Sequence, residues 1–390
     1  MAYRKFKATQ LFDGYSFRED AVLITDSKGV VSELVNIEDA GEGVEELAGI
    51  LTPGLINAHC HLELSHLKGV IPPHTGLIEF LCSVVTKRNF PREVIDEAIV
   101  AAEQEMYNNG IVAVGDIGNT ADTAFVKSTG RICWQNFVEV LSMTDAQAEQ
   151  ELTHYKKVAD QLSNSLVNAA LPHRTSLVPH APYTISPSTF QSLNDLTEGR
   201  IISMHNQEHP AEDVLYQTGS GDYLKLFRVF GLDESPFPVT GKTSIRSVLP
   251  YFNKRQQIFL VHNTYMPQED IEWANDYAES NGIKLVYCLC PSANLYIENK
   301  LPDTKLFASL DCLLVLGTDS YSSNWQLSIA EEIRVLHEHQ KISLASLLRM
   351  ATMNGALALR WQDMLGSFEK GKQPGVVLLA EDLRSVKRIL

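Results

Sequence analysis

Eight short runs rich in apolar and β-branched residues recur between residues 53 and 365, and helical patterns separate them. The runs span residues 55–60, 111–116, 132–138, 175–179, 201–205, 257–262, 284–289 and 313–318. Strands that alternate with helices predict βα units and a parallel sheet. Eight such units within roughly 310 residues predict an α/β fold with a (β/α)8 TIM-like barrel, and a doubly wound open sheet is the rival architecture.

The two ends of the chain have a different pattern. Residues 1–52 contain short runs at 6–11, 21–25 and 30–35, separated by turn residues such as Asp-Gly and Ser-Lys-Gly. Residues 366–390 contain a turn-rich stretch followed by one strand-like run. Short strands separated by such turns are typical of antiparallel pairs. We therefore expect residues 1–52 and 366–390 to form one small β-sandwich domain beside a barrel domain of residues 53–365.

The composition is that of an ordinary globular protein, with 44% hydrophobic and 21% charged residues among 390. The net charge of −15 argues against binding to nucleic acid or to an anionic membrane, because phosphate recognition needs concentrated Lys and Arg. No apolar run reaches the ~18–20 residues of a membrane span, and the first residues lack the apolar core of a secretory signal. The six scattered cysteines are typical of reduced thiols. We expect a cytoplasmic protein whose partner is a small molecule.

Two histidines, His59 and His61, stand at the end of the first barrel run. Side chains two residues apart on a strand share a face, so both imidazoles can reach one metal ion. The pattern alone proves little, because a chance His-x-His is expected roughly 0.4 times in a chain with this histidine content. The pair His337 and His339 follows a helical pattern, where residues two apart diverge, and we interpret it as a solvated helix end.

Polar residues that can bind metal or carry protons stand at the ends of the other runs as well. In a (β/α)8 barrel the catalytic residues sit at the C-terminal ends of the strands. Seven of the eight runs end in such a group, and the seventh run, Tyr-Cys-Leu-Cys-Pro, is the exception. The groups are His59, His61, Asp116, Glu139, His180, His205, His262 and Asp319. Their recurrence at one end of successive strands predicts a shared site.

Several short motifs occur in a fixed order along the chain. They are Pro-Gly-Leu-Ile-Asn-Ala-His-Cys-His at 53–61, Pro-His-Ala-Pro-Tyr-Thr at 179–184, His-Asn-Gln-Glu at 205–208, Val-His at 261–262, Cys-Pro-Ser-Ala-Asn at 290–294 and Gly-Thr-Asp-Ser at 317–320. In this order and spacing the sequence resembles the amidohydrolase superfamily, in particular its mononuclear-metal deaminase branch. The resemblance covers nearly the whole chain.

The resemblance implies a role for each residue that matches a motif. By position, the metal ligands would be His59, His61, His205 and Asp319. Three nitrogens and one carboxylate suit one divalent ion, zinc first and iron second. The residue beside the metal's water would be His262, and the proton shuttle would be Glu208. The catalytic group is therefore expected to be Glu208, His262 and Asp319.

The fourth run bears on the number of metal ions. Two-metal members of the superfamily usually bridge their ions with a carboxylated lysine at this strand, and residues 171–186 contain no lysine. His180 stands there instead and resembles the substrate-binding histidine of the deaminases. We therefore expect a single metal ion and a substrate contact from His180.

The expected reaction is hydrolytic removal of an exocyclic amine from a purine-like ring, which leaves a lactam and ammonia. The alternatives are hydrolysis of a cyclic amide or of a substituted triazine-like ring by the same site, and a non-catalytic homologue. The Leu-Glu-Leu-Ser segment at 62–65 is similar to that of aminodeoxyfutalosine deaminases. Further candidate substrate contacts are Glu63, Asn324 and Trp325, although each also fits a structural role. Pairing into a homodimer stays open.

Overall fold

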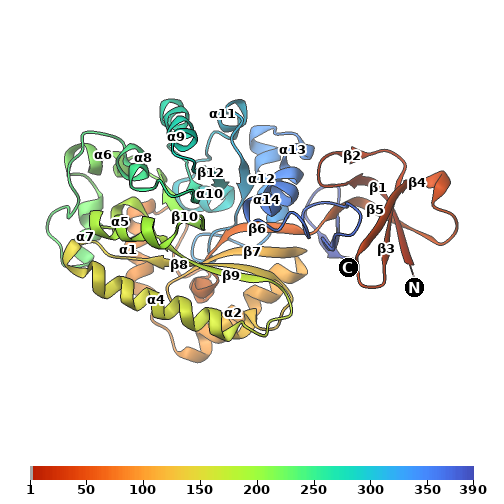
Figure 1. Ribbon diagram of the computed structural model, residues 1–390, viewed down its shortest axis with the longest axis horizontal. Coiled ribbons are helices and arrows are strands. Elements are labelled where there is room, and N and C mark those ends of the chain that lie inside the picture. The colour runs from red at the N-terminus through yellow and green to blue at the C-terminus, as the bar shows by residue number, and fades with distance from the viewer. Residues whose placement is uncertain (1–2) are drawn as a thin grey trace.

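The computed structural model describes residues 3–390. A larger body of parallel strands and helices lies beside a smaller sheet that contains strands from both ends of the chain (Figure 1). Within residues 3–390, none of the helices combines the length and the apolar character needed to cross a bilayer.

The body contains two four-stranded parallel sheets. The first sheet holds, in spatial order, β6 (Leu55–Cys60), β7 (Ile111–Gly118), β8 (Cys133–Val140) and β9 (His173–Pro179). The second holds β10 (Ile201–Asn206), β11 (Gln257–His262), β12 (Lys284–Leu289) and β13 (Leu314–Leu316). These are the eight expected strands, in their expected order. Five of them, β6, β8, β10, β11 and β13, are buried at every position, as is expected of parallel strands covered on both faces.

Backbone hydrogen bonds also connect the outer strands of the two sheets. On one side the amide of His205 donates to the carbonyl of His180 at 3.0 Å. On the other side the amides of Thr318 and Asp319 both donate to the carbonyl of His59 at 3.0 Å. These bonds bring the C-terminal ends of β6, β9, β10 and β13 together.

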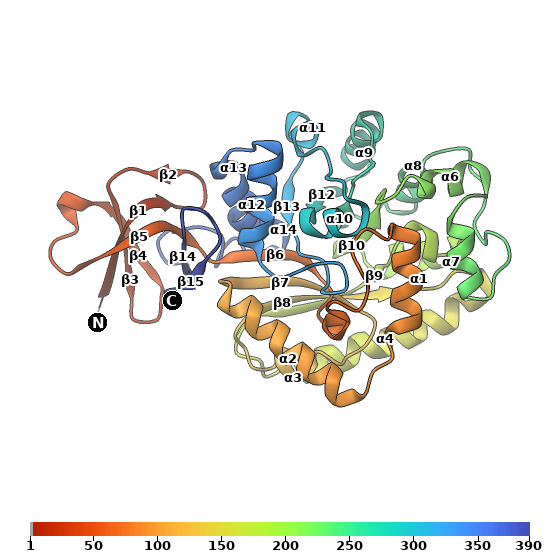
Figure 2. The same ribbon diagram turned by 180° about the vertical axis from the view of Figure 1, so that it is seen from behind.

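Helices cover the strands of the body on the outside (Figures 1 and 2). Their amphipathic spacing explains the packing: α4 buries Leu152, Tyr155, Val158 and Leu162, which recur every three or four residues. The helices are α1 (Leu77–Lys87), α2 (Arg92–Asn108), α3 (Ala124–Lys127), α4 (Ala148–Ser165), α5 (Pro187–Leu196), α6 (Ala211–Thr218), α7 (Tyr223–Val229), α8 (Ser244–Val248), α9 (Gln268–Ser280), α10 (Pro291–Glu298), α11 (Thr304–Ser309), α12 (Ile329–Gln340), α13 (Leu344–Arg349) and α14 (Gly355–Ala358).

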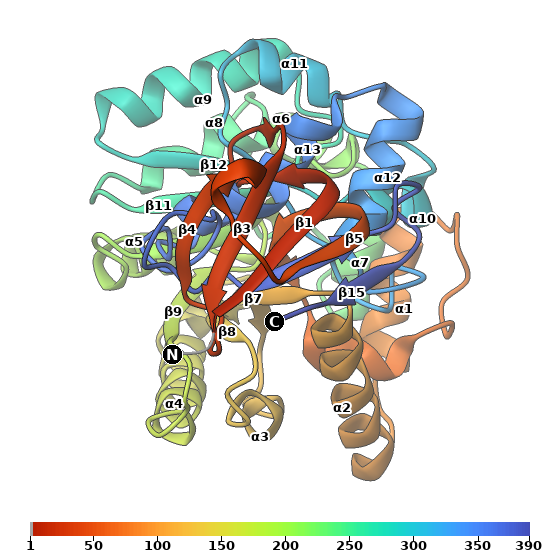
Figure 3. The ribbon, with the colours of Figure 1, turned by 90° about the vertical axis from the view of Figure 1, so that its right-hand side faces the viewer.

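The smaller sheet has seven strands and is seen face-on in Figure 3. Its strands are β1 (Tyr3–Phe12), β2 (Phe17–Arg18), β3 (Ala21–Asp26), β4 (Val31–Asn36), β5 (Val44–Pro53), β14 (Val376–Leu379) and β15 (Val386–Arg388). The spatial order β15-β14-β5-β1-β3-β4 interleaves the two ends of the chain, with β2 paired to β1. The described strands of these ends form one sheet, so the expected β-sandwich is not confirmed.

Strand β5 is the longest element of this sheet that the sequence pattern does not predict, and the short strands β2 and β15 are the others. Its first half, Val-Glu-Glu-Leu-Ala, is largely exposed and contains two glutamates, whereas its last five residues are buried. It pairs with β1 in parallel and with β14 in an antiparallel ladder from Val376–Pro53 to Leu379–Ile50. Because β5 runs directly into β6, the sheet and the body share one continuous buried segment.

Candidate metal centre and active site

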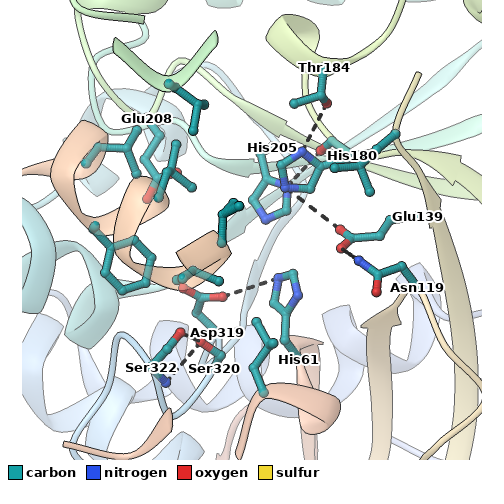
Figure 4. Close-up of a pocket in the computed structure, with 18 of the residues that line it drawn as sticks. His61, Asn119, Glu139, His180, Thr184, His205, Glu208, Asp319, Ser320 and Ser322 are labelled. Carbon is teal, nitrogen blue, oxygen red and sulfur yellow. Dashed lines mark hydrogen bonds and ion pairs between the residues drawn. The ribbon is translucent and has the colours of Figure 1, made fainter. Parts of the chain in front are cut away.

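The C-terminal ends of β6, β10 and β11 surround one cavity of about 810 Å³, its open mouth included. His59, His205 and His262 belong to these strands, while His61 and Asp319 lie just beyond β6 and β13. All five are buried, the most exposed being His205 at 8%. Figure 4 shows His61, His205 and Asp319 facing one another across the cavity. The strand-end prediction thus brought these five residues to one place.

The donor atoms of this group are spaced as a small cation requires. Nε2 of His59 lies 3.2 Å from Nε2 of His61, and Oδ1 of Asp319 lies 3.5 and 3.4 Å from these two nitrogens. Donor atoms of His59, His61 and His205 all fall within 4.8 Å of one another, as do those of His59, His262 and Asp319. A tetrahedral zinc site with ligands at 2.0–2.2 Å has ligand atoms about 3.3–3.6 Å apart. The donor set fits one such ion.

Hydrogen bonds orient these side chains toward the centre. Nδ1 of His205 donates to the carbonyl of His180 at 2.7 Å, which leaves its Nε2 free as an acceptor. The hydroxyl of Ser323 donates to Oδ2 of Asp319 at 2.5 Å and leaves Oδ1 facing the histidines. The Nδ2 amide of Asn294 donates to Nδ1 of His262 at 3.3 Å, so the hydrogen of that imidazole is at Nε2.

The electrostatics of the cluster keep its histidines neutral. Burial lowers the pKa of His205, and it lowers the pKa of His59, His61 and His262 well below the ordinary value. For Asp319 burial acts in the opposite direction, but the neighbouring His61 and His262 hold the pKa of its carboxyl below the ordinary value. Neutral imidazoles and an ionised carboxylate are the protonation states that bind a metal.

Two lone pairs at close range also indicate a cation. The Nδ1 atoms of His59 and His61 are buried and have no hydrogen-bond partner within residues 3–390. If these nitrogens carry the hydrogens, the Nε2 atoms, 3.2 Å apart, present lone pairs to each other and to Asp319. A divalent ion between them satisfies all three groups at once.

The backbone around the cluster is held in uncommon conformations. His262 and Asp319 have φ angles of 73° and 58°, in the left-handed region that non-glycine residues seldom adopt. Such conformations persist where surrounding structure over-determines them, and they concentrate at functional sites. Gly317 is required for another reason, since a Cβ there would lie 2.7 Å from Cβ of His59. Because Gly317 has no side chain, β13 can approach β6 closely enough for the Asp319 carboxylate to reach the histidines.

Glu208 lines the same cavity, on the side opposite Glu139 in Figure 4. Its Oε1 lies 3.6 Å from Nε2 of His262, and the residue is 4% exposed. Burial, together with the negative charges of Asp319, Glu212 and Glu298, raises the pKa of Glu208 well above the ordinary value. This carboxyl therefore keeps its proton to a higher pH than an exposed glutamate does, which suits it to give a proton to a bound ligand.

The other expected substrate residues are placed differently. His180 and Glu63 line the cavity, whereas Asn324 and Trp325 are not among its lining residues. The Asn324 amide donates to the carbonyl of Thr318 at 2.7 Å and to Glu332 at 3.0 Å. Trp325 is 51% exposed and packs edge-on against Tyr296. The structure therefore does not bring Asn324 and Trp325 to the site.

Asp116, which belongs to the strand-end pattern, and the pair His337 and His339, which does not, have structural surroundings. Asp116 accepts a hydrogen bond from the amide of Leu62 at 2.9 Å and pairs with buried Lys127 at 2.6 Å. It therefore anchors the turn that follows His61 and does not line the cavity. His337 and His339 are exposed at the end of α12, as their helical spacing predicted.

Sequence reasoning gave no role to several residues that line the cavity. Glu139 stood in the strand-end pattern, and Arg88 and Asn119 come from segments with no motif. Glu139 is 5% exposed, and burial next to Glu63 raises its pKa to about 8. Position at a strand end was the available signal for Glu139, whereas nothing in the sequence marks Arg88 or Asn119.

The wall of the cavity away from the metal ligands is apolar. Helices α1 and α7 contribute most of it, and they contact each other. The apolar lining residues of the two helices and the residue after α7 are Leu77, Phe80, Leu81, Val84, Val85, Leu226 and Phe230. A mostly apolar wall with a few convergent polar groups is typical of a site for a small organic ligand.

Comparison with known proteins agrees with this geometry. Residues 50–388 match the model of the amidohydrolase family. The chain is 25% identical over 350 residues to the aminodeoxyfutalosine deaminase of a Nitratiruptor species, covering 87% of this chain and 81% of that protein. The crystal structure of Helicobacter pylori aminofutalosine deaminase superposes with a TM-score of 0.79 at 19% identity, over 97% of this chain and 92% of that one.

A zinc-containing structure is also similar. An adenosine deaminase from Xanthomonas campestris, with bound zinc, superposes with a TM-score of 0.74 at 21% identity, over 98% of this chain and 85% of that one. At these identities the structural likeness shows the fold. The family match, in contrast, spans most of the sequence and includes the residues at every strand end described above. The chain belongs to the amidohydrolase family.

Proposed function

We propose that this amidohydrolase is a metal-dependent hydrolytic deaminase that converts an amine-bearing purine-like ring to a lactam and ammonia. One observation carries the proposal. Four buried histidines and one aspartate meet at the floor of a cavity that Glu208 also lines, and burial raises the pKa of the Glu208 carboxyl well above the ordinary value. A metal centre next to a proton donor is what the addition of water to a ring carbon requires. The purine deaminases among the curated relatives support the same reaction.

The proposed ligands of a single divalent ion are His59, His61, His205 and Asp319. Zinc suits three imidazoles and one carboxylate, with ferrous iron as the alternative. One ion is favoured because none of the described residues that line the cavity is a lysine that could bridge two. When bound, the metal supplies Lewis acidity and lowers the pKa of a water from 15.7 toward ~7.

The chain's own residues move the protons in this scheme. Asp319 and the Nε2 hydrogen of His262 hold the attacking water, and the Asp319 carboxylate accepts its proton. Glu208 gives its proton to the ring nitrogen beside the amine-bearing carbon, then takes the hydrogen of the hydroxyl formed on that carbon and passes it to the departing amine. The proton held by Asp319 returns to Glu208 and completes the cycle. Water adds to the carbon, the carbon–nitrogen bond breaks, and ammonia and the lactam are released. His180 contacts the ring or its substituent.

The proposed setting is one closed (β/α)8 barrel of residues 53–365, flanked by a domain of residues 1–52 and 366–390. The hydrogen bonds from His205 to His180 and from Asp319 to His59 support closure at the two seams. Closure matters for function because the ligands come from both four-stranded sheets. The cavity then lies at the C-terminal mouth of the barrel, where catalytic residues of such folds are found.

The test is ammonia release from a panel of adenine and guanine nucleosides and the free bases, with metal content measured on the same preparation. We expect about one divalent ion per chain and ammonia release from at least one aminopurine. Release of ammonia or chloride from substituted triazines with no aminopurine turnover would favour the ring-hydrolase alternative. A metal-loaded protein that turns over neither class would contradict the proposal.

A further inference from the structure

The seventh barrel strand, β12, ends without a polar group, and its contribution to the site comes from the helix that follows it. Helix α10 begins at Pro291, directly after its N-cap residue Cys290. Asn294, in the first turn of α10, is 1% exposed, and its Nδ2 amide donates to Nδ1 of His262 at 3.3 Å. The hydrogen bond at one ring nitrogen sets which nitrogen carries the hydrogen. The position of α10 therefore controls both the place and the tautomer of His262.

The start of α10 is not capped by its own residues. Cys290 makes no side-chain cap hydrogen bond, and Pro291 has no amide hydrogen. The amide of Ser292 donates instead to Oε2 of Glu332, a residue of α12, at 2.8 Å. Amides in the first turn of a helix have no partner within that helix. Glu332 therefore supplies, from a neighbouring helix, the acceptor that a capping side chain gives elsewhere.

A second branch leads from Glu332 to Asp319. Oε1 of Glu332 accepts a hydrogen bond from the Nδ2 amide of Asn324 at 3.0 Å, and the same amide donates to the carbonyl of Thr318 at 2.7 Å. An amide NH₂ group has two hydrogens, so these two bonds use both of them and fix its orientation. Thr318 directly precedes Asp319. This branch therefore fixes the backbone from which the Asp319 carboxylate projects.

Glu332 is 0% exposed and is not among the residues that line the cavity. Burial raises its pKa to about 8. Both of its oxygens accept a hydrogen bond from the chain, and a carboxyl retains this capacity whether or not it holds a proton. The two bonds thus do not depend on ionisation. One buried carboxyl connects α10, which carries Asn294, to the turn after β13, which carries Asp319.

We propose that Glu332 is a positioning residue that fixes His262 and Asp319 relative to each other, so that both hold the same attacking water. The inference rests on the proposed deamination, because the roles of His262 and Asp319 come from that proposal. The two residues belong to different units, at β11 and just beyond β13, and their donor atoms lie within 4.8 Å of each other. A displacement of about 1 Å at such a site costs about 10²-fold in rate.

The experiment compares wild type with Glu332→Gln, which keeps the size of the side chain and replaces one acceptor oxygen by an NH₂ group. That group meets a donor, either the Ser292 amide or the Asn324 amide, so one branch is broken. The substrate is the aminopurine with the highest wild-type rate, with zinc in excess and zinc content measured. We expect kcat to fall about 10–100-fold, with KM nearly unchanged because Glu332 does not line the cavity.

NMR of ¹⁵N-labelled histidine rings in the zinc-loaded protein supplies a readout that does not depend on turnover. The signals of His262 are identified by their absence from His262→Gln. The shifts of the two ring nitrogens report which one carries the hydrogen. We expect hydrogen at Nε2 in wild type and a mixture of both tautomers in Glu332→Gln and in Asn294→Ala, because the bond to Nδ1 is loosened or lost.

The matched control for the loss of a buried carboxyl is Glu103→Gln. Glu103 lies on α2, is 1% exposed and pairs with Arg131, and it does not line the cavity. We expect this variant to have a lower melting temperature, with unchanged kcat and unchanged His262 signals. A general loss of stability is thereby separated from a loss of positioning.

The two branches are also tested one at a time. Asn294→Ala and Asn324→Ala should each lower kcat, and they keep the proposal testable if Glu332→Gln does not fold. Glu332→Gln combined with each of them should, in at least one pairing, lose less than the product of the two single losses, because residues in one hydrogen-bond network are not independent.

A Glu332→Gln protein with wild-type kcat and an unchanged His262 tautomer would overturn the proposal. So would single losses that multiply fully in both double variants, or a fall in kcat that Glu103→Gln reproduces. If Glu332→Gln does not fold, unchanged kcat and unchanged His262 signals in Asn294→Ala and Asn324→Ala have the same meaning. Absence of ammonia from every aminopurine in wild type would instead refute the proposed deamination, while the NMR signals still test the positioning of His262.

Discussion

Glu212, at the start of α6, offers a quantitative test of how strongly burial raises the pKa of a carboxyl near the site. The residue is fully buried, and its Oε1 accepts hydrogen bonds from the amide of Gln207, at 3.0 Å, and from the hydroxyl of Ser244. Its Oε2 has no partner within residues 3–390. Burial is the main cause that raises the pKa of Glu212 to about 8. We predict that Glu212→Gln makes the protein more stable than wild type at alkaline pH.

The sign follows from the two protonation equilibria. The folded state binds the Glu212 proton more tightly than the unfolded state, whose carboxyl has the ordinary pKa of 4.5. Between pH 4.5 and about 8 the folded form therefore holds the extra proton, and the unfolding free energy falls as pH rises. The difference between the folded and unfolded pKa values of Glu212, at 1.36 kcal/mol for each pKa unit, corresponds to a loss of about 5 kcal/mol in unfolding free energy once the pH is well above 8. Glutamine has no proton to lose and escapes this decline.

The assay is urea unfolding of wild type and Glu212→Gln at pH 5, 7 and 9, read as the difference between the two proteins at each pH. Taking the difference removes the pH dependence of metal binding, which both proteins share. Glu279→Gln, at an exposed position of α9, is the control: it shows how the loss of one surface carboxylate alone changes the unfolding free energy at each pH. The difference should grow by several kcal/mol toward pH 9 in favour of the variant. A flat difference, or a variant that is weaker at pH 9, would refute the reasoning.

Three further substitutions test the centre and its support. Glu208→Gln should retain the metal, measured by elemental analysis, and lose about 10²–10⁴-fold in turnover because the proton shuttle is gone; a wild-type rate would remove Glu208 from the mechanism. Ser323→Ala frees Oδ2 of Asp319 and should weaken metal affinity about 10–100-fold in chelator competition, with unchanged affinity as the contrary result. Lys127→Met leaves Asp116 buried without its cation and should cost about 3–5 kcal/mol in denaturant unfolding, whereas a loss below about 1 kcal/mol would show that the pair is not needed.

The parallel strands could be predicted from the sequence because their physical signal is strong and local. A strand covered on both faces is continuously apolar for about six residues, and a polar residue directly after it marks the edge of the sheet. That reasoning placed His59, His205 and His262 at one edge, where the structure has them. Strand β5 lacks this signal, because its first half is charged and exposed and gains its order from pairing with β1.

Side chains on loops were harder to predict because their direction depends on partners that are distant in sequence. Asn324 follows Asp319 closely, yet its amide turns toward Thr318 and Glu332 and away from the cavity. The orientation of the Glu139 carboxyl depends in the same way on a hydrogen bond from Asn119, whose own amide accepts a hydrogen bond from Arg88. No local pattern encodes such three-residue arrangements. Ligands on strand ends are therefore predictable from sequence, whereas the substrate-facing wall is not.

The pairing of β14 with β5 has a consequence for the synthesis of the chain. One edge of β5 is matched by β1 as soon as both strands have been made, but the other edge waits for Val376–Leu379. At about 5–20 residues per second, the roughly 320 residues between the two strands take about 15–65 s to translate. During that interval the segment that leads directly into the first metal ligands presents an open, hydrogen-bonding edge. Strands β14 and β15, made long after β5, thus close the sheet that adjoins the first half of the metal centre.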